Sequence, residues 1–296
     1  MRGFLFFGAL CAVSVPTFAG DVNPDKIEKL DSVIVSASRA GENTPVTFTN
    51  LNKEELRKVN PMNSLVQALS LQPSVVTSLE GGTGLGYSKM TVRGVKGSQI
   101  NVTLNGITLN DAESQEVFWV NIPALTSLIN SVQLQRGLGT SSNGPGAFGA
   151  SINMSTASVG TSPFGYVNVA AGSYNTMTMT ASAGTGLTKS GLYFSAAYSK
   201  DCTDGYIRNA KAKVQSAFAA LGWLKGNNSL KLTYLMGDQH SGITWNGIDP
   251  QMYKTNRKYN STGEFYDADG AVHYYDNDTD NYTQHHIQLN YTHEFA

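Results

Sequence analysis

The sequence predicts a mixed α+β domain followed by antiparallel strands of a transmembrane β-barrel. Charged residues make up 15% of the chain and hydrophobic residues 41%, whereas soluble domains usually carry about 25% charged residues. From about residue 160 onward, apolar and polar residues alternate with the period of a β-strand. No apolar run reaches about eighteen residues, which excludes a helical membrane span. A chain of this kind that crosses a membrane must form a closed barrel, because lipid cannot satisfy an open sheet edge.

Residues 1–19 have the features of a secretory signal peptide. Met1 and Arg2 give a short positive start, an apolar run follows, and Thr17 and Ala19 are small residues at the positions that a signal peptidase reads. The segment is too short for a membrane span of about 20 residues. A buried N-terminal helix is the alternative interpretation; the signal peptide accounts for more of the pattern and predicts export.

The two cysteines do not form a disulfide in this interpretation. Cys11 lies within the signal, and Leu10 stands where a lipoprotein anchor requires a small residue, so we reject lipidation. Removal of the signal leaves Cys202 as the only thiol. Loss of Arg2 also changes the formal net charge from −1 to −2. No basic face for nucleic acid is present.

Residues 20–40 read as an extended polar arm that contains one β-prone segment. A short exposed strand has free N–H and C=O groups that can pair with the sheet edge of another protein. On physical grounds alone, an ordinary first strand of the next domain is equally acceptable. The segment consists of Asp31, Ser32, Val33, Ile34, Val35, Ser36 and Ala37.

Residues 41–157 read as a compact mixed unit, and about 110 residues can bury a core. Helical spacing follows Asn50 or Asn52 as N-cap, and prolines end the helical segments. The turn Asn105–Gly106 separates two apolar runs, and Gly81–Gly86 is a flexible loop. The expected helical segments are Lys53–Lys58, Ser64–Leu71 and Pro123–Ile129, and the expected strands are Val46–Thr49, Met90–Val92, Ile100–Leu104 and Val132–Gln135.

Residues 158–296 read as barrel strands of about 10 residues joined alternately by tight turns and longer loops. A soluble β-sandwich shares the alternation, but aromatic residues near the strand ends favour a membrane: Tyr166, Tyr193, Tyr198, Trp223, Tyr234 and Tyr291. About six strands are legible. They contain Tyr166–Val169, Met177–Thr180, Leu192–Tyr198, Val214–Trp223, Leu230–Tyr234 and Ile287–Thr292.

Four ordered motifs resemble those of TonB-dependent outer-membrane receptors. Leu30–Arg39 resembles the TonB box of these receptors, and Thr91–Gly94 resembles an Arg-Gly motif of their plug domain. Val102–Asp111 is similar to a further plug segment, with Asn105 replacing the commoner Asp. Ser131–Gly137, continued by Gly146–Met154, resembles the closing segment of the plug. The resemblance covers the box and the plug, and it extends to the barrel by general character.

The resemblance implies roles for particular residues. Asp31–Ala37 would pair as an added strand with the periplasmic protein TonB, which relays energy from its inner-membrane complex. Arg93 and Arg136 match plug arginines that pair with glutamates of the barrel wall in the family. A guanidinium suits this latch because it binds carboxylates bidentately. Ordinary stabilisation of the plug is the alternative for both arginines.

Ligand is expected to meet the outward plug loops 81–88 and 111–119, with the long loop Gly237–Asn281 closing over it. Aromatic residues of that loop either stack on ligand or stiffen the loop. The candidate ligand-binding residues are Gly82, Gly84, Tyr87, Phe118, Trp119, Trp245 and Tyr253.

Two patterns resemble metal-binding motifs, but we predict no metal site at either of them. Asp276–Asp280 has the oxygen spacing of a calcium loop, but Asn281 replaces the turn glycine and Ile287 the closing glutamate. His285 and His286 are adjacent on a strand and point to opposite faces. We expect no catalytic residues, because no nucleophile–base–acid set is visible, and no cofactor.

The favoured function is energised import across the bacterial outer membrane of a scarce ligand, with a ferric siderophore as first choice. Cobalamin, haem or a glycan are alternative ligands, and outer-membrane lipid surrounds the protein. A non-transporting interaction module is the rival from another class, and an enzyme ranks third. Plugged transporters have about 22 strands, and a barrel of about eight is filled by its own side chains. Six strands with a plug therefore predict a fragment or truncated product.

Overall fold

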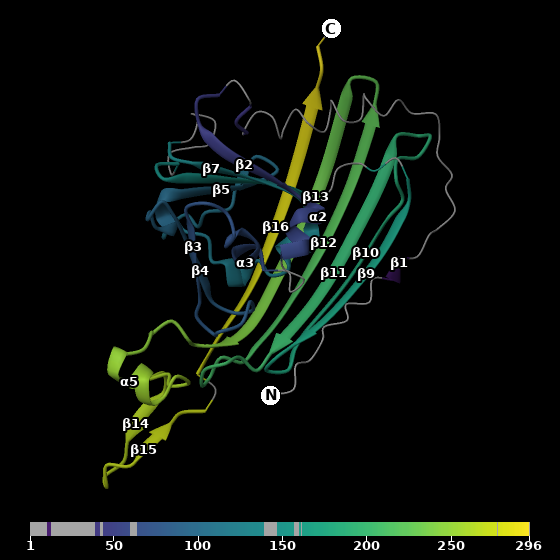
Figure 1. The fold of residues 1–296 in the computed structure, drawn as a ribbon. Helices are drawn as coiled ribbons and strands as arrows, with labels where there is room; N and C mark the ends of the chain where they lie inside the picture. Colours follow the sequence, from purple (N-terminus) through teal and green to yellow (C-terminus); the bar gives the residue numbers. More distant parts are fainter. Residues whose placement is uncertain are drawn as a thin grey trace.

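The computed structural model describes residues 11–12, 39–41, 44–59, 64–138, 147–156, 160, 162–276 and 278–295. The segment Asp31–Ala37 and all of the predicted signal except Cys11–Ala12 lie outside the described residues. Two parts are visible in Figure 1. A globular plug domain lies against one face of a large sheet of long, tilted strands, which we call the wall sheet. No helix in the described ranges is both long and apolar enough to cross a membrane.

The plug domain is built on a mixed five-stranded sheet of order β2-β7-β8-β5-β6. β5 and β8 are parallel, and the other neighbours are antiparallel. A separate antiparallel hairpin is formed by β3 and β4. The strands are β2 (Thr47–Asn52), β3 (Val75–Leu79), β4 (Ser88–Val92), β5 (Ile100–Leu104), β6 (Ile107–Thr108), β7 (Ile129–Arg136) and β8 (Ala150–Thr156).

Short helices pack beside this sheet, and local sequence explains their boundaries. Asn52 Oδ1 accepts from the Glu55 backbone N–H at 2.9 Å, and Glu55 Oε2 accepts from the Asn52 N–H at 2.8 Å. This reciprocal pair is a capping box that fixes the start of the first helix, and it confirms Asn52 as the cap. Ser64 caps the next helix by a single bond, since its hydroxyl oxygen accepts from the Gln67 backbone N–H at 3.3 Å. The helices are α2 (Lys53–Val59), α3 (Leu65–Leu69), α4 (Leu125–Leu128), η1 (Gly97–Gln99) and η2 (Trp119–Asn121).

The turn between β5 and β6 is the expected tight hairpin. Asn105 and Gly106 have φ of 53° and 79°, and a two-residue turn with two positive φ values matches the twist of the flanking strands. Asn105 Oδ1 also accepts from the Thr156 N–H at 3.0 Å. The asparagine at this position therefore joins the turn to the end of β8.

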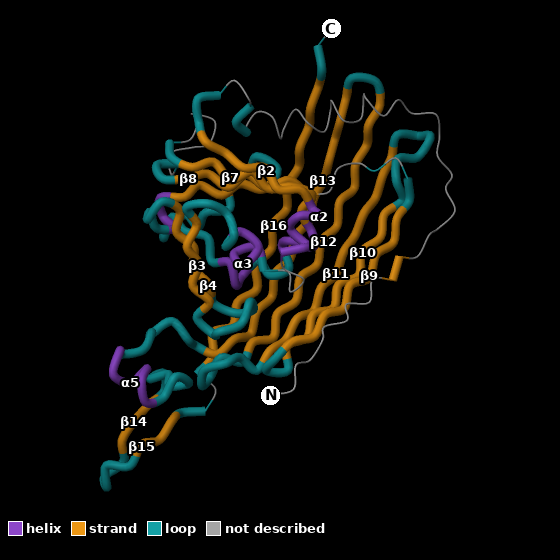
Figure 2. Tube along the Cα trace, viewed as in Figure 1, coloured by secondary structure: helices purple, strands orange, loops and turns teal. Residues whose placement is uncertain are grey.

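The wall sheet is antiparallel, with the order β1-β9-β10-β11-β12-β13-β16. Figure 2 shows these strands as one continuous surface with the plug domain on a single side. All six strands that the sequence predicts are present. The members are β1 (Cys11–Ala12), β9 (Phe164–Gly172), β10 (Thr176–Gly184), β11 (Leu192–Thr203), β12 (Ala212–Lys225), β13 (Asn228–Gly242) and β16 (Thr279–His293).

The long connection between β13 and β16 is shorter than expected. The predicted loop Gly237–Asn281 loses both its ends to the sheet, because β13 runs to Gly242 and pairs there with Thr279. Residues 237–242 of this extension contain no large apolar side chain, so no apolar–polar alternation marks them as a strand in the sequence. Residues 243–278 carry α5 (Pro250–Thr255) and the hairpin of β14 (Glu264–Tyr266) and β15 (Val272–Tyr274), which project beyond the wall strands in Figure 1.

The wall sheet is polar on its inner face and apolar on its outer face. Inward side chains are buried and largely polar, whereas the outward ones are exposed and largely apolar, which is the reverse of a soluble domain. Inward residues include Thr178, Thr180, Ser199, Ser216 and Thr233, and outward residues include Met177, Met179, Phe194, Leu232, Ile287 and Leu289.

One apolar core joins the plug domain to the middle of the wall sheet. Leu56, Leu104 and Ile152 are fully buried inside the plug domain, and Phe218 of β12 and Leu235 of β13 belong to the same cluster. The inner face of the wall is therefore polar along most of its length and apolar where the plug domain rests on it. This core fixes the position of the plug loops relative to the ends of the wall strands.

Candidate functional site at the seam between plug domain and wall

The glycine loop of the plug domain packs against a wall connection. The Tyr206 backbone N–H donates to the Gly81 carbonyl at 2.9 Å. Gly82 has φ of 77°, and a Cβ at this position would lie 2.7 Å from the Tyr206 Cβ. Glycine is therefore required at residue 82 both for its backbone conformation and for the close approach of Tyr206. The loop is held by the connection between β11 and β12.

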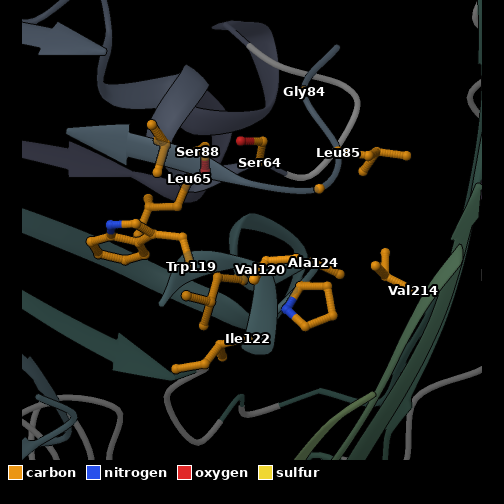
Figure 3. A pocket seen from close by; sticks show the side chains of 14 residues that line it. Ser64, Leu65, Gly84, Leu85, Ser88, Trp119, Val120, Ile122, Ala124 and Val214 are labelled. Atoms are coloured by element: carbon orange, nitrogen blue, oxygen red, sulfur yellow. The ribbon is translucent and has the colours of Figure 1, made fainter. Parts of the chain in front are cut away.

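Gly84 and Trp119 line the same small cavity, together with Ser64, Leu65 and Val214 (Figure 3). The cavity volume is about 30 Å³, whereas ligand pockets for drug-sized molecules measure about 300–1,000 Å³. A Cβ on Gly84 would collide with Oε1 of Gln67. The structure thus brings two predicted ligand residues together around a space that has room for water and is too small for a metal chelate.

Tyr87 makes a hydrogen bond and a ring contact across the seam. Its hydroxyl donates to Oδ2 of Asp280 on β16, and the same carboxylate oxygen accepts from Gln239 Nε2 at 3.1 Å. The Tyr87 ring meets Trp245 edge to face, with centroids 4.8 Å apart and an interplanar angle of 84°. Burial, followed by the hydrogen bond to Asp280, raises the pKa of the Tyr87 phenol. Tyr87 and Trp245, two predicted ligand residues from distant segments, therefore lie in direct ring contact.

Phe118 and Tyr253 are exposed, at 47% and 49%. Phe118 immediately precedes η2 on the plug domain, and Tyr253 lies on α5 of the long loop. The guanidinium carbon of Arg257 stands 5.1 Å from the centroid of the Tyr253 ring. Both rings are accessible for stacking, in contrast to Trp119, which is partly buried against the core.

The long loop is ordered by contacts that sequence patterns did not predict individually. Arg208 donates to the Asn260 carbonyl at 2.6 Å and stacks at 3.6 Å over the Tyr274 ring. Glu264 Oε1 accepts from the Tyr266 hydroxyl at 2.9 Å, and a hydrogen bond to Glu264 raises the pKa of Tyr259 to about 12. These contacts support the stiffening role for the loop aromatics near β14 and β15.

Arg93 and Arg136 lie beside each other in the plug domain. Arg136 Nε donates to the Pro73 carbonyl and Nη2 to Thr49 Oγ1, both at 2.8 Å, and Arg93 Nη1 donates to the Arg136 carbonyl at 3.3 Å. Burial, and then the charge of Arg93, lowers the pKa of Arg136. These hydrogen-bond partners are all neutral, and the salt bridges seen among the described residues, Lys89–Glu80 and His273–Asp267, do not include either arginine.

Arg39 is a functional candidate that the sequence interpretation did not single out. Its Nη2 donates to the carbonyls of Ser131 at 3.2 Å and Asn153 at 2.9 Å, and burial lowers its pKa to about 10. The adjacent Ala40 exchanges two hydrogen bonds with the Gln133 amide, at 2.7 and 2.9 Å. These contacts fasten the chain to β7 and β8 immediately after residues 31–37. The only sequence signal was the position of Arg39 at the end of the TonB-box-like segment.

Among the described side chains, no group of three His, Cys, Asp or Glu residues could hold a metal ion. His285 is exposed on the outer face of β16, and His286 is half-buried on the inner face. Asn277 of the calcium-like pattern lies outside the described residues. The contacts of Tyr87 across the seam are an edge-to-face ring contact and a hydrogen bond.

The fold and the seam together describe a wall of antiparallel strands with a separate plug domain packed on one face. Residues 40–151 match the family model of the TonB-dependent receptor plug domain. These residues are therefore a plug domain of the TonB-dependent receptors, and the antiparallel strands that follow have the fold of the same receptors. The resemblance is confirmed for the plug motifs within residues 40–151, whereas the TonB-box-like segment precedes the matched residues and stays a prediction. No curated protein matches the sequence of the chain.

Solved structures of this family share the fold at low sequence identity. The ferripyoverdine receptor of the outer membrane of Pseudomonas aeruginosa is 15% identical with a TM-score of 0.62, covering 87% of this chain and 33% of the receptor. The ferric yersiniabactin uptake receptor of Yersinia pestis is 16% identical with a TM-score of 0.56, covering 70% of this chain and 34% of the receptor. The copper transporter OprC is 19% identical with a TM-score of 0.56, covering 67% of this chain and 32% of the transporter. The chain spans about a third of the length of these structures.

Proposed function

We propose that this chain is the plug domain and part of the barrel wall of a TonB-dependent outer-membrane transporter. The observation that carries the proposal is the polarity of the wall sheet, which has exposed Met179, Phe194 and Leu289 outside and buried Thr180, Ser199 and Ser216 inside. Only a sheet whose outer face meets hydrocarbon and whose inner face meets a polar lumen gains stability from this arrangement. The match of residues 40–151 to the plug family supports the same conclusion.

The proposed ligand is a metal chelate, with a ferric siderophore as first choice. Two of the similar structures are receptors for ferric siderophores, and a third transports copper. Tyr87 and Trp245 meet where the plug loop approaches the long connection of the wall, and Phe118 and Tyr253 present accessible rings. Because the cavity beside Gly84 is about 30 Å³, the chelate would rest on the outer surface of the seam.

Energy would enter through residues 31–37, which we propose as the strand that pairs with TonB. Arg39 and Ala40 supply the attachment through which a pull on that segment would reach β7 and β8. We also propose that Arg93 and Arg136 bind carboxylates of further wall strands. Two adjacent guanidinium groups with neutral partners favour an added anion, since each charged pair is strengthened in a bidentate geometry.

The test is uptake by the full-length protein in a Gram-negative host that lacks other receptors for the supplied chelate. Val33→Pro removes the N–H that a paired strand requires, so it should abolish accumulation of radioactive iron from a ferric siderophore while leaving binding to whole cells unchanged. Val33→Ile keeps that N–H and serves as the matched control, with parental uptake expected.

Two outcomes would contradict the proposal. Parental uptake by Val33→Pro and by a Val35→Pro variant would refute the assignment of residues 31–37. Absence of energised uptake by the parent, with binding retained for every chelate tried, would favour the non-transporting interaction module.

A further inference from the structure

The outer face of the wall sheet carries three basic side chains at the end where the long connections lie. Lys200 of β11, Lys213 of β12 and His240 of β13 are all exposed, and their neighbours Ser199 and Gln239 face inward and are buried. In the strand register, Lys213 lies directly opposite His240 and also opposite Cys202, two residues from Lys200. Opposed side chains on one face are about 5 Å apart and diagonal ones about 7–8 Å. The three therefore form one row.

The charges of this row are not neutralised by salt bridges within the described residues. The two salt bridges seen there involve neither lysine. One carboxylate, Asp238, lies on the same face, and it accepts from Gln215 Nε2 at 2.9 Å and from the Thr283 hydroxyl at 2.7 Å. Two lysines against one carboxylate that is already hydrogen-bonded leave a net positive surface.

An apolar hollow lies on the same outer face, beside Tyr198 and two residues along β11 from Lys200. Its volume is about 400 Å³, and its lining is mainly apolar. Small outward residues of adjacent strands form its floor, and larger residues flank it. The register places Ala181 opposite both Val167 and Tyr198, and Ala183 opposite both Gly165 and Ala196. The plug domain lies on the other side of this sheet (Figure 1).

We propose that this outer surface binds a phosphate-bearing lipid of the outer leaflet, and this inference depends on the outer-membrane location proposed above. The phosphate would contact Lys200 and Lys213, and an acyl chain would occupy the hollow beside Tyr198. Charge complementarity selects an anionic head group, because basic residues next to a membrane attract anionic lipid. The apolar hollow on the same face selects a lipid over free phosphate, and long connections mark the external end of a barrel.

The test uses the full-length protein, purified in detergent from the outer membrane, with lipid A as the probe and native mass spectrometry as the readout. A K200Q/K213Q variant should bind lipid A roughly 25-fold more weakly, since each basic contact contributes about fivefold. Lys225 is the matched control: it is exposed on the same face of the same strand as Lys213 but at the opposite end. K225Q should bind as the parent does.

A second variant tests the hollow. Ala181→Phe fills it without changing a charge, and we expect weaker binding of lipid A with no effect on ligand uptake. Inorganic phosphate alone should not compete at millimolar concentration. Parental lipid binding by K200Q/K213Q, or an equal loss in K225Q, would overturn the inference. Because lipid binding is measured without TonB or chelate, its failure in a protein that still imports ligand leaves the proposed function intact, and loss of uptake with retained lipid binding does the reverse.

Discussion

The Tyr87 hydroxyl in the plug domain donates a hydrogen bond to Asp280 in the wall, across 193 residues of sequence. The same ring packs edge to face against Trp245, which belongs to the long connection that follows β13. One side chain thus links a plug loop, a wall strand and an outer loop. A ligand that displaces Tyr87 would loosen all three at once.

Removing the hydroxyl should weaken this link without disturbing the ring. We expect Tyr87→Phe to reduce the free energy of unfolding by about 1–3 kcal/mol, because the partner is a charged acceptor and the site is partly buried. Faster amide hydrogen exchange in residues 80–87 would report local opening of the loop. Trp245→Ala is the complementary variant, since it keeps the hydrogen bond and removes the ring. Unchanged exchange in Tyr87→Phe would show that the hydrogen bond does not hold the loop.

Alkaline pH should open the same link. Burial and the neighbouring Asp280 raise the pKa of Tyr87 above its ordinary value of 10.0. The stabilisation from the protonated phenol is therefore complete below pH 10 and is lost as pH rises through the folded-state pKa. Thermal unfolding followed between pH 8 and pH 12 should show a steeper decline for the parent than for Tyr87→Phe. Parallel declines would contradict a role for this phenol.

Substitutions at Gly82 and Gly86 distinguish the cost of backbone strain from the cost of a steric clash. Both have positive φ, 77° and 84°, but a Cβ at residue 82 would meet Tyr206, whereas at residue 86 it would lie 3.7 Å from Ala212. Gly86→Ala should lower the free energy of unfolding only by the backbone strain, about 1–2 kcal/mol. Gly82→Ala should lower it further, because the added Cβ also clashes with Tyr206. Chemical denaturation of the two variants provides the comparison. Equal losses would mean that Tyr206 moves aside freely.

Arg39 should couple the arm to the plug sheet. Arg39→Ala removes two hydrogen bonds from a charged donor to backbone carbonyls. We expect the free energy of unfolding to fall by about 1–3 kcal/mol. Energised uptake should fall while chelate binding stays at the parental level, because the ligand side of the plug is untouched. Arg39→Lys retains the charge without the planar group and should give an intermediate result. Parental uptake in both variants would place the attachment elsewhere.

Local patterns predicted the elements well where a short segment contains all the necessary information. The capping box of Asn52 and Glu55 and the Asn105–Gly106 turn are set by neighbours in sequence, so both were legible. The predicted boundaries were less accurate at the ends of wall strands. β13 continues to Gly242 because β16 supplies hydrogen-bond partners there, and its last residues show no apolar alternation.

The site was only partly predictable for the same reason. Tyr87 and Trp245 were candidates individually, and nothing in the sequence indicated that they touch. Gly84 and Trp119 were also candidates, but the structure encloses them around a cavity too small for a chelate. Arg39 was passed over because its partners, Ser131 and Asn153, lie about a hundred residues away in β7 and β8.

The sequence alone determined the two-part organisation of this protein, its element types and the family motifs of its plug domain. These follow from periodicity, capping and turn chemistry, which operate over a few residues. Tertiary structure alone decided which plug loop meets which wall strand, which aromatic rings remain accessible and which basic side chains share the outer face. Those relations depend on strand register and on packing between distant segments, and a shift of one residue in register would move every wall side chain to the opposite face.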